Sequence, residues 1–148
     1  MKNLIITALL FVLALAGCEK KAEAPQYEIY ENHNISACGV NDPLRNLDWL
    51  AEFTANYKDK AINVTIYLYA NIETKEENIV MIYRRYTYYE DGNFLETMDL
   101  YYANQVYSCS GERLFADSSE EHYEEWYDFF HSGKNESQGI IWYRSRIK

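Results

Sequence analysis

Positive charge is scarce in this sequence. Of its 148 residues, 14 are Lys or Arg and 23 are Asp or Glu, which gives a net charge of −9 and a pI near 4.8. Proteins that hold nucleic acid by neutralising phosphates carry the opposite balance, so this class of partner is excluded. The aromatic fraction of 16% argues against disorder over most of the chain.

Recognisable catalytic and metal-binding motifs are also missing. None of the serines stands in a G-x-S-x-G context, and no H-E-x-x-H is present. His122 and His131 each have an acid three positions away, Glu125 and Asp128, but no third ligand follows at metal-binding spacing. A carboxylate pair for glycoside hydrolysis can come from anywhere in a chain, and 23 acids offer no basis for choosing one. We therefore predict no catalytic site, no metal and no cofactor.

No apolar stretch is long enough to span a bilayer comfortably. The run from Leu4 to Ala16 has 13 residues and follows Lys2, which is typical of a secretory signal. It leads into LAGC at 15–18, which matches the lipobox of bacterial lipoproteins, where the Cys becomes the acylated N-terminus. We expect residues 1–17 to be a cleaved signal peptide. We expect Cys18 to carry lipid that includes a palmitate chain. The alternative is an ordinary cleaved signal with an incidental Cys.

The residues after Cys18 are polar. EKKAEAPQ at 19–26 has too few apolar groups to offset the entropy of ordering, so we interpret 18–27 as a flexible tether and 28–148 as one domain. Bacterial lipoprotein sorting disfavours Asp directly after the Cys for outer-membrane delivery, and Glu19 stands there instead. The expected location is the outer membrane, with the periplasmic and the outer face both open.

Three cysteines are an odd number until Cys18 is assigned to lipid. Cys38 and Cys109 then remain as a pair in an oxidising compartment, and we predict one disulfide between them. Two buried free thiols are the alternative. Neither Cys has a second Cys or His at ligand spacing, so no metal site is predicted at this pair.

Two helices are predicted from apolar residues at helical spacing. The first spans about Pro43 to Tyr57, with Asp42 as its N-cap. The second runs from a capping box, Ser118 with Glu121, to a stop at Gly133. Its aromatic residues line one face: Tyr123, Trp126, Tyr127 and Phe130.

Strands are predicted where apolar and polar residues alternate or where β-branched and aromatic residues gather. The ranges are 62–70, 79–89, 94–102, 105–115 and 139–146, with a turn at 90–93, a bulge or tight bend at Gly111, and a short strand or extended arm at 27–35. The fold class that follows is α+β: a single, mostly antiparallel sheet of four to five strands with two helices packed on one face.

Tyrosine is the residue type in clear excess, with 15 copies. Tyr67 and Tyr69 lie opposite the apolar face of their strand, and Tyr86 and Tyr88 share a face of the next, with Arg84 at its edge. Aligned across the sheet, these residues would form a platform that binds protein or glycan, because Tyr offers apolar area, a hydroxyl and little entropy to lose. Cross-strand aromatic packing is the alternative, and the favoured one.

Two segments resemble a known pattern. CGVNDPL at 38–44 with LDWL at 47–50, and VYSCSGE at 106–112, are similar to segments of small uncharacterised lipoproteins of Bacteroidota. The resemblance covers about half of the chain after the signal. It implies the disulfide and a helix-on-sheet arrangement. It brings no established activity, so no functional residue is carried over.

The function expected from these features is a lipid-anchored, non-enzymatic module of the bacterial cell envelope. It would be held on the membrane by the N-terminal lipid and would bind an envelope protein or a glycan. The alternative is an inhibitor of an exported protease or other enzyme, acting through a loop at 71–78 or 90–93. An envelope hydrolase is a third, less favoured hypothesis.

Overall fold

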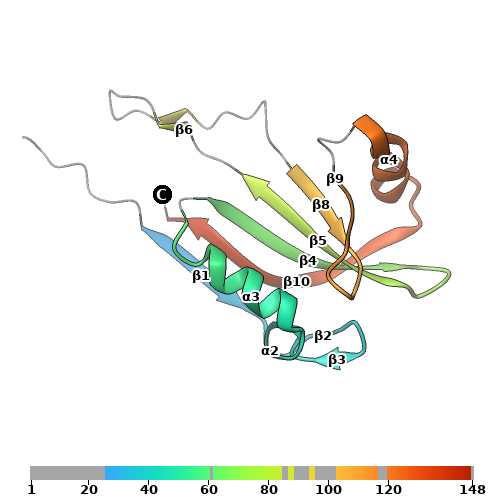
Figure 1. Ribbon diagram of the computed structural model, residues 1–148, viewed down its shortest axis with the longest axis horizontal. Coiled ribbons are helices and arrows are strands. Elements are labelled where there is room, and N and C mark those ends of the chain that lie inside the picture. Colours follow the sequence, from blue (N-terminus) through green and yellow to red (C-terminus); the bar gives the residue numbers. More distant parts are fainter. Residues whose placement is uncertain are drawn as a thin grey trace, which may run out of the picture.

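The computed structural model describes residues 26–60, 62–84, 87–88, 94–95, 103–116 and 120–147 (Figure 1). The expected signal peptide at 1–17, the expected lipid site Cys18 and most of the expected tether lie outside these residues. Within the described part, no helix is long and apolar enough to cross a membrane.

A six-stranded sheet forms the body of the fold, and each strand is antiparallel to its neighbours. In spatial order the strands are β1 (Tyr27–Glu31), β10 (Asn135–Arg146), β4 (Asn63–Asn71), β5 (Glu77–Arg84), β8 (Ala103–Tyr107) and β9 (Arg113–Ala116). The α+β class and the antiparallel sheet are confirmed, but the sheet is larger than the four to five strands predicted. The long β10 lies between β1 and β4, so the N-terminal strand also finds a partner.

Two further strand pairs stand apart from this sheet. β2 (Ser36–Ala37) pairs with β3 (Val40–Asn41), and β6 (Thr87–Tyr88) pairs with β7 (Phe94–Leu95). The β6–β7 pair brackets the predicted turn at 90–93, which itself lies outside the described residues. The predicted pairing of 94–102 with 79–89 is confirmed at this short pair, but the main-sheet neighbour of β5 is β8, and 96–102 lie outside the described residues.

The predicted helix at 43–57 is interrupted. α2 (Pro43–Asn46) and α3 (Asp48–Tyr57) are separated by Leu47, whose backbone is extended at φ −111° and ψ 100°. Pro43 opens the first of them, as predicted. The predicted N-cap, Asp42, has a left-handed backbone with φ 49° and makes no side-chain capping bond.

The second predicted helix is shorter than expected. A 3₁₀ turn, η1 (Glu120–His122), leads into α4 (Tyr123–His131), which begins without a side-chain capping bond. Ser118 of the predicted capping box lies outside the described residues. Gly133 follows the helix with φ 74°, which confirms the predicted stop, because glycine adopts this conformation without a steric penalty.

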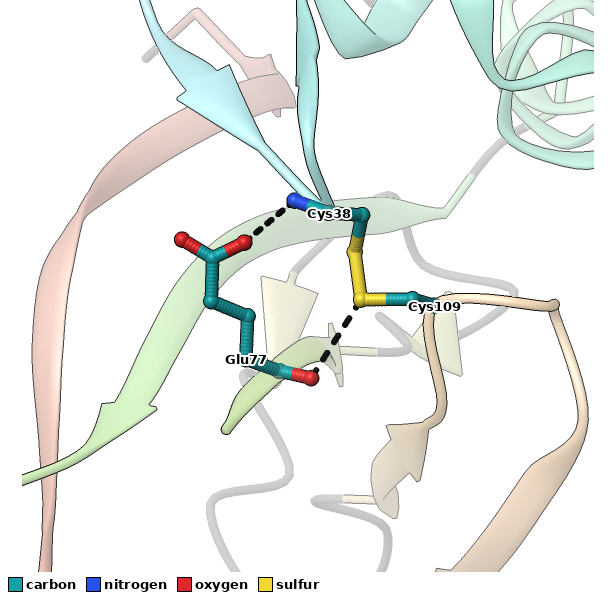
Figure 2. Close-up of side chains that lie close together, drawn as sticks. All are labelled: Cys38, Glu77 and Cys109. Atoms are coloured by element: carbon teal, nitrogen blue, oxygen red, sulfur yellow. Dashed lines mark hydrogen bonds between the residues drawn. A yellow bond between two sulfur atoms is a disulfide. The ribbon is translucent and has the colours of Figure 1, made fainter. Parts of the chain in front are cut away.

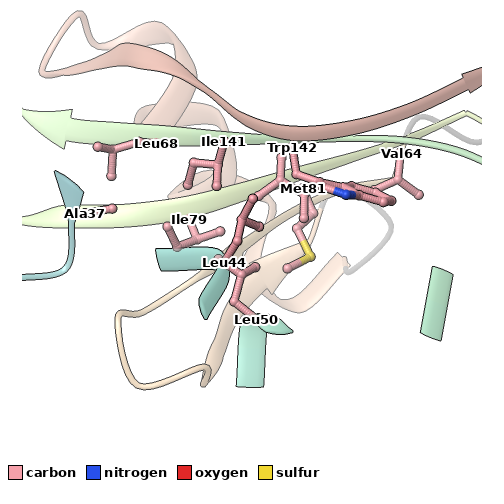
Figure 3. Close-up of a cluster of buried hydrophobic side chains, with 10 residues drawn as sticks. Ala37, Leu44, Leu50, Val64, Leu68, Ile79, Met81, Ile141 and Trp142 are labelled. Carbon is pink, nitrogen blue, oxygen red and sulfur yellow. The ribbon is translucent and has the colours of Figure 1, made fainter. Parts of the chain in front are cut away.

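The two helices pack on opposite faces of the sheet. Leu50 of α3 is buried with Ile66 and Leu68 of β4 in the larger core cluster, which also holds Trp142 (Figure 3). The alternate residues of the sheet face the other way, where Phe129 of α4 packs in a second cluster. The prediction of both helices on one face is therefore wrong. A strand alternates its side chains, and both faces of these central strands carry large apolar groups that need a cover.

The two ends of the sheet differ in what they carry. At one end, the backbone N–H of Ile147 donates to the carbonyl of Gln26 at 2.9 Å, so the start of β1 and the end of β10 lie together. At the other end, α4 leads directly into the start of β10 (Figure 1). The segment that continues from the expected tether is thus remote from α4.

Candidate functional site

A disulfide joins two turns of the fold. Cys38 in the β2–β3 turn and Cys109 in the β8–β9 turn are bonded across 71 residues, with their Cα atoms 5.3 Å apart (Figure 2). This confirms the predicted pairing. Cys38 and the following Gly39 both have left-handed backbones, with φ 56° and 75°. The Cys-Gly pair therefore forms the tight turn that presents the sulfur to Cys109.

Side chains around the disulfide hold both turns in place. The backbone N–H of Cys38 donates to the carboxylate of Glu77 (Figure 2), and the indole N–H of Trp49 donates to the carbonyl of Cys109 at 3.1 Å. A Cβ on Gly111 would lie 2.7 Å from Cγ of Trp49, so only glycine fits there. This confirms the predicted tight bend at Gly111, whose φ is 85°.

The same cluster has the residue types of a metal site but not the chemistry. Among the described residues, Cys38, Glu77 and Cys109 are the one group of three possible ligands whose donor atoms lie within 4.8 Å of one another. Cysteine binds metals as thiolate, and both sulfurs here are bonded to each other. We conclude that this cluster links the two turns and does not hold an ion.

The predicted tyrosine platform is only partly within the described residues. Tyr86 lies outside them, as do the side chains of Arg84 and Tyr88, although Tyr88 has its backbone in β6 and so belongs to a different sheet. Tyr67 and Tyr69 lie on β4 and face the α4 side, and both are half-buried.

Tyr69 packs beneath α4. Its ring centroid lies 5.8 Å from that of Phe129, 5.9 Å from that of Phe130 and 6.4 Å from that of Tyr67. Burial raises the pKa of its hydroxyl above the ordinary value. These contacts match the packing alternative: Tyr69 is part of the joint between the sheet and α4.

The other tyrosines are spread over both faces. On the α3 side, Tyr83 contacts Tyr57 with ring centroids 5.8 Å apart, and burial raises the pKa values of Tyr83 and Tyr107. On the α4 side, Tyr30 and Tyr143 are cross-strand partners whose rings stack 5.2 Å apart. The tyrosine excess therefore serves several packing contacts, and no single sheet face collects it.

Among the residues that the structure describes, the most exposed aromatic side chains lie on α4. Tyr123, Tyr127 and His131 recur every four residues, and we call them the aromatic ladder. Tyr123 and Tyr127 are 53% and 51% exposed. Their ring centroids are 6.2 Å apart, and the imidazole of His131 stacks on Tyr127 at 4.2 Å with 9° between the planes. The ring of Trp126 stacks on Tyr123 at 5.8 Å.

Sequence reasoning missed this surface because it placed Tyr123 and Tyr127 on the same apolar face as Phe130. Phe129, which falls outside that stripe, is instead the buried residue of the helix, at 9% exposure. The face that packs on the sheet is therefore turned toward Phe129, which leaves Tyr123 and Tyr127 turned away from the sheet. The sequence did offer one signal: Phe has no polar group that must stay in water, so it favours the buried face of a helix over a neighbouring Tyr.

Acidic side chains extend from η1 along the exposed side of α4, and we call them the acid row: Glu121, Glu124, Glu125 and Asp128. All four are exposed. The Glu125 carboxylate lies 3.8 Å from Nδ1 of His122, and the Asp128 carboxylate lies 3.8 Å from Nζ of Lys134. Both pairs are exposed to solvent. The imidazole Nδ1 of His131, three positions after Asp128, bonds to the Tyr127 carbonyl at 3.0 Å.

A chain of alternating charges surrounds His33. Its Nδ1 lies 2.9 Å from the carboxylate of Asp42 and its Nε2 lies 3.2 Å from that of Glu31. Arg45 in turn contacts Asp42 at 3.4 Å, and Lys58 contacts Glu31 at 2.8 Å. The hydrogen bond that the His33 imidazole donates to Asp42 raises the pKa of His33, and the bond that Lys58 donates to Glu31 lowers the pKa of Glu31. This His33 clasp ties β1 to both helices of the α3 side.

The inhibitor hypothesis names two loops, and the structure describes one of them, the turn between β4 and β5. The side-chain oxygen of Asn71 accepts bonds from the backbone N–H groups of Glu73 and Thr74, both at 2.9 Å. Ile72 is 42% exposed, and its N–H donates to the carbonyl of Lys134 at 2.8 Å. The other loop, 90–93, lies outside the described residues.

Comparisons with protein-family models, with curated proteins and with solved structures found no significant match to this chain.

Proposed function

We propose that this chain is a lipid-anchored, non-enzymatic protein-binding module of the bacterial cell envelope, and that the aromatic ladder on α4 is its contact surface. The observation that carries the proposal is the pair of half-exposed rings, Tyr123 and Tyr127, on a helix whose fold contacts are made by other residues. Tyr and Trp supply large contact area at a low cost in conformational entropy, which is why they concentrate at the centres of protein interfaces.

The way in which the ladder's rings lie favours a protein partner over a glycan. A sugar ring stacks on an open aromatic face. Here Tyr127 and His131 stack face to face, and Tyr123 is stacked on Trp126. Each of these rings therefore has one face covered by a neighbouring ring, which leaves less open ring face for a sugar, and the tyrosine hydroxyls and the imidazole suit the mixed apolar and hydrogen-bonding contacts of a protein interface.

The position of α4 fits a protein held on a lipid anchor. The expected tether enters the domain at β1, at the end of the sheet remote from α4 (Figure 1). Eight residues at 19–26 reach at most about 28 Å when fully extended. Lipid on Cys18 would therefore hold the domain close to the membrane with its ladder directed away from the attachment point.

The inhibitor hypothesis is the second candidate, because the β4–β5 turn is rigidly bonded and presents Ile72 at its start. Protein inhibitors of proteases present a preorganised loop, which lowers the entropy cost of binding. In that case Ile72, and not the ladder, would make the contact.

One experiment separates the two candidates. The tagged full chain is isolated from detergent-solubilised envelopes of the cells that produce it, and the co-isolated proteins are quantified by mass spectrometry. We compare the wild type with Tyr123→Ser/Tyr127→Ser and with Ile72→Ser, after checking that all three have similar melting temperatures.

We expect a protein that is enriched by the wild type and by Ile72→Ser, and whose enrichment falls at least about tenfold in the ladder variant, as truncation of interface hot spots produces. Loss in Ile72→Ser alone would favour the inhibitor. The absence of any ladder-dependent protein would contradict the proposal.

A further inference from the structure

We propose that the segment which docks on the ladder is basic, so that its Lys or Arg side chains lie along the acid row of α4. This inference rests on the proposed function, because it takes the ladder to be a contact surface, and it names the chemistry of the partner.

The ladder lies between the buried side of α4 and its acidic side. Phe129 is buried against the sheet at 9% exposure. With 3.6 residues per turn, Tyr127 and His131 fall about 160° around the helix from Phe129 and Tyr123 falls about 120° from it, while Glu124 and Asp128 occupy the next sector beyond His131. A partner seated on the ladder therefore meets carboxylates along one flank.

The carboxylates of the acid row are poorly neutralised by the domain itself. Of the described residues, none brings a cationic nitrogen within 4 Å of Glu121 or Glu124, and the side chains of Asp128 and its partner Lys134 are 65% and 55% exposed. An exposed pair of this kind contributes little. The four carboxylates of the acid row therefore have one Lys and two His, His122 and His131, as basic neighbours.

The spacing of the acids makes this charge unfavourable for the isolated helix. Glu124 and Asp128 are four residues apart within α4, which places like charges beside each other on the helix surface. Glu124 and Glu125 gain from the helix dipole because they lie in the first turn of α4. Asp128 does not, since it lies near the C-terminal end. A cationic partner would relieve this repulsion.

Lys and Arg also suit the ladder. Their aliphatic stems cover apolar surface while the charged head reaches a carboxylate, so one residue can lie over a Tyr ring edge and pair with Glu124 or Asp128. Salt screens exposed charge pairs of this kind, so a contact that depends on them weakens as the ionic strength rises.

The test uses a photoreactive benzoylphenylalanine at Ser132, an exposed position directly after α4 that belongs to neither the ladder nor the acid row. Membranes that contain the full chain are irradiated in about 50 mM and about 300 mM NaCl, which changes the Debye length from roughly 14 Å to roughly 6 Å. The adduct yield is measured for this protein, for Glu124→Gln/Asp128→Asn, and for the matched control Glu73→Gln/Glu76→Gln in the β4–β5 turn. The cross-linked peptide is then sequenced.

We expect the adduct yield to fall about fivefold at high salt, and the acid-row variant to give that low yield at both salt concentrations. The control variant should give the same adduct yields as the protein with its native acid row. The cross-linked peptide should carry net positive charge. A neutral or acidic peptide, or a yield that ignores both salt and the acid row, would overturn the inference and leave the protein-binding function in place. No adduct under any condition would count against both.

Discussion

Replacing single tyrosines by alanine should separate the rings that hold the fold from the ring that faces a partner. Tyr69 lies under α4 with three aromatic neighbours, whereas Tyr127 is 51% exposed and contacts rings of its own helix. Tyr69→Ala should therefore loosen α4 from the sheet. Tyr127→Ala should leave that joint intact.

The magnitudes follow from burial. Truncating a fully buried aromatic side chain costs about 3 to 5 kcal/mol. Tyr69 is half-buried, so its loss should cost about 2 kcal/mol, which includes its ring pairs with Phe129 and Phe130. Tyr127 loses surface contacts at a spacing of four residues, and such changes cost about 0.5 kcal/mol.

Equilibrium urea unfolding measures both values. Trp142 is fully buried and Trp126 is half-buried on α4, so tryptophan fluorescence reports loss of the core and of the α4 joint. With an m-value near 2 kcal/mol per molar urea, Tyr69→Ala should lower the midpoint by about 1 M and Tyr127→Ala by about 0.25 M. Equal losses in the two variants would show that the ladder is part of the core, and would refute the assignment of the surface.

Three further changes test other parts of the fold. Cys38→Ser/Cys109→Ser opens a loop of 71 residues and should cost about 4 kcal/mol by denaturant unfolding, while a cost below about 1 kcal/mol would mean that the bond does not constrain the unfolded chain. The folded pKa of His33 is raised above 6.5, so its clasp should stabilise fully below about pH 6.5 and weaken as pH rises through the folded pKa. A pH series of unfolding midpoints should lose this slope in His33→Gln, and an unchanged slope would assign it to another group. Gly111→Ala should lower the melting temperature more than Gly133→Ala, because both glycines have positive φ but only Gly111 faces an indole at 2.7 Å; equal losses would contradict that close contact.

Local patterns in the sequence were enough to predict several elements. The alternation around Ile66 marked β4, Pro43 marked a helix start, and Gly133 marked a helix stop, because each depends on neighbouring residues alone. The Cys38–Cys109 pair followed from counting the cysteines once Cys18 was set aside.

Features that depend on distant contacts were not predictable in this way. The place of β10 between β1 and β4 depends on pairings that span most of the chain. The break at Leu47 is likewise invisible to periodicity, because apolar residues continue through it at helical spacing.

For function, the most important incorrect prediction concerned which residues of α4 face the sheet. A helical stripe shows that a face is apolar, but it does not show which sheet face the helix will cover. Tyrosine adds to the ambiguity, because it is stable both in a core and at a surface. In the structure, Phe129 packs against Phe115, with ring centroids 5.5 Å apart. This contact orients α4 so that Tyr123 and Tyr127 are exposed.

Hydroxyl-radical footprinting tests the central claim, that the ladder is covered by a partner in the envelope, most directly. The oxidation rates of Tyr123 and Tyr127 are compared between the purified full chain and membranes of the cells that produce it. Tyr30 is the internal reference, since it is 41% exposed at the other end of the sheet. We predict that both ladder tyrosines are oxidised about fivefold more slowly in membranes while Tyr30 is unchanged, because a bound partner excludes water from the rings. Equal rates for Tyr123 and Tyr127 in the two samples would contradict the account.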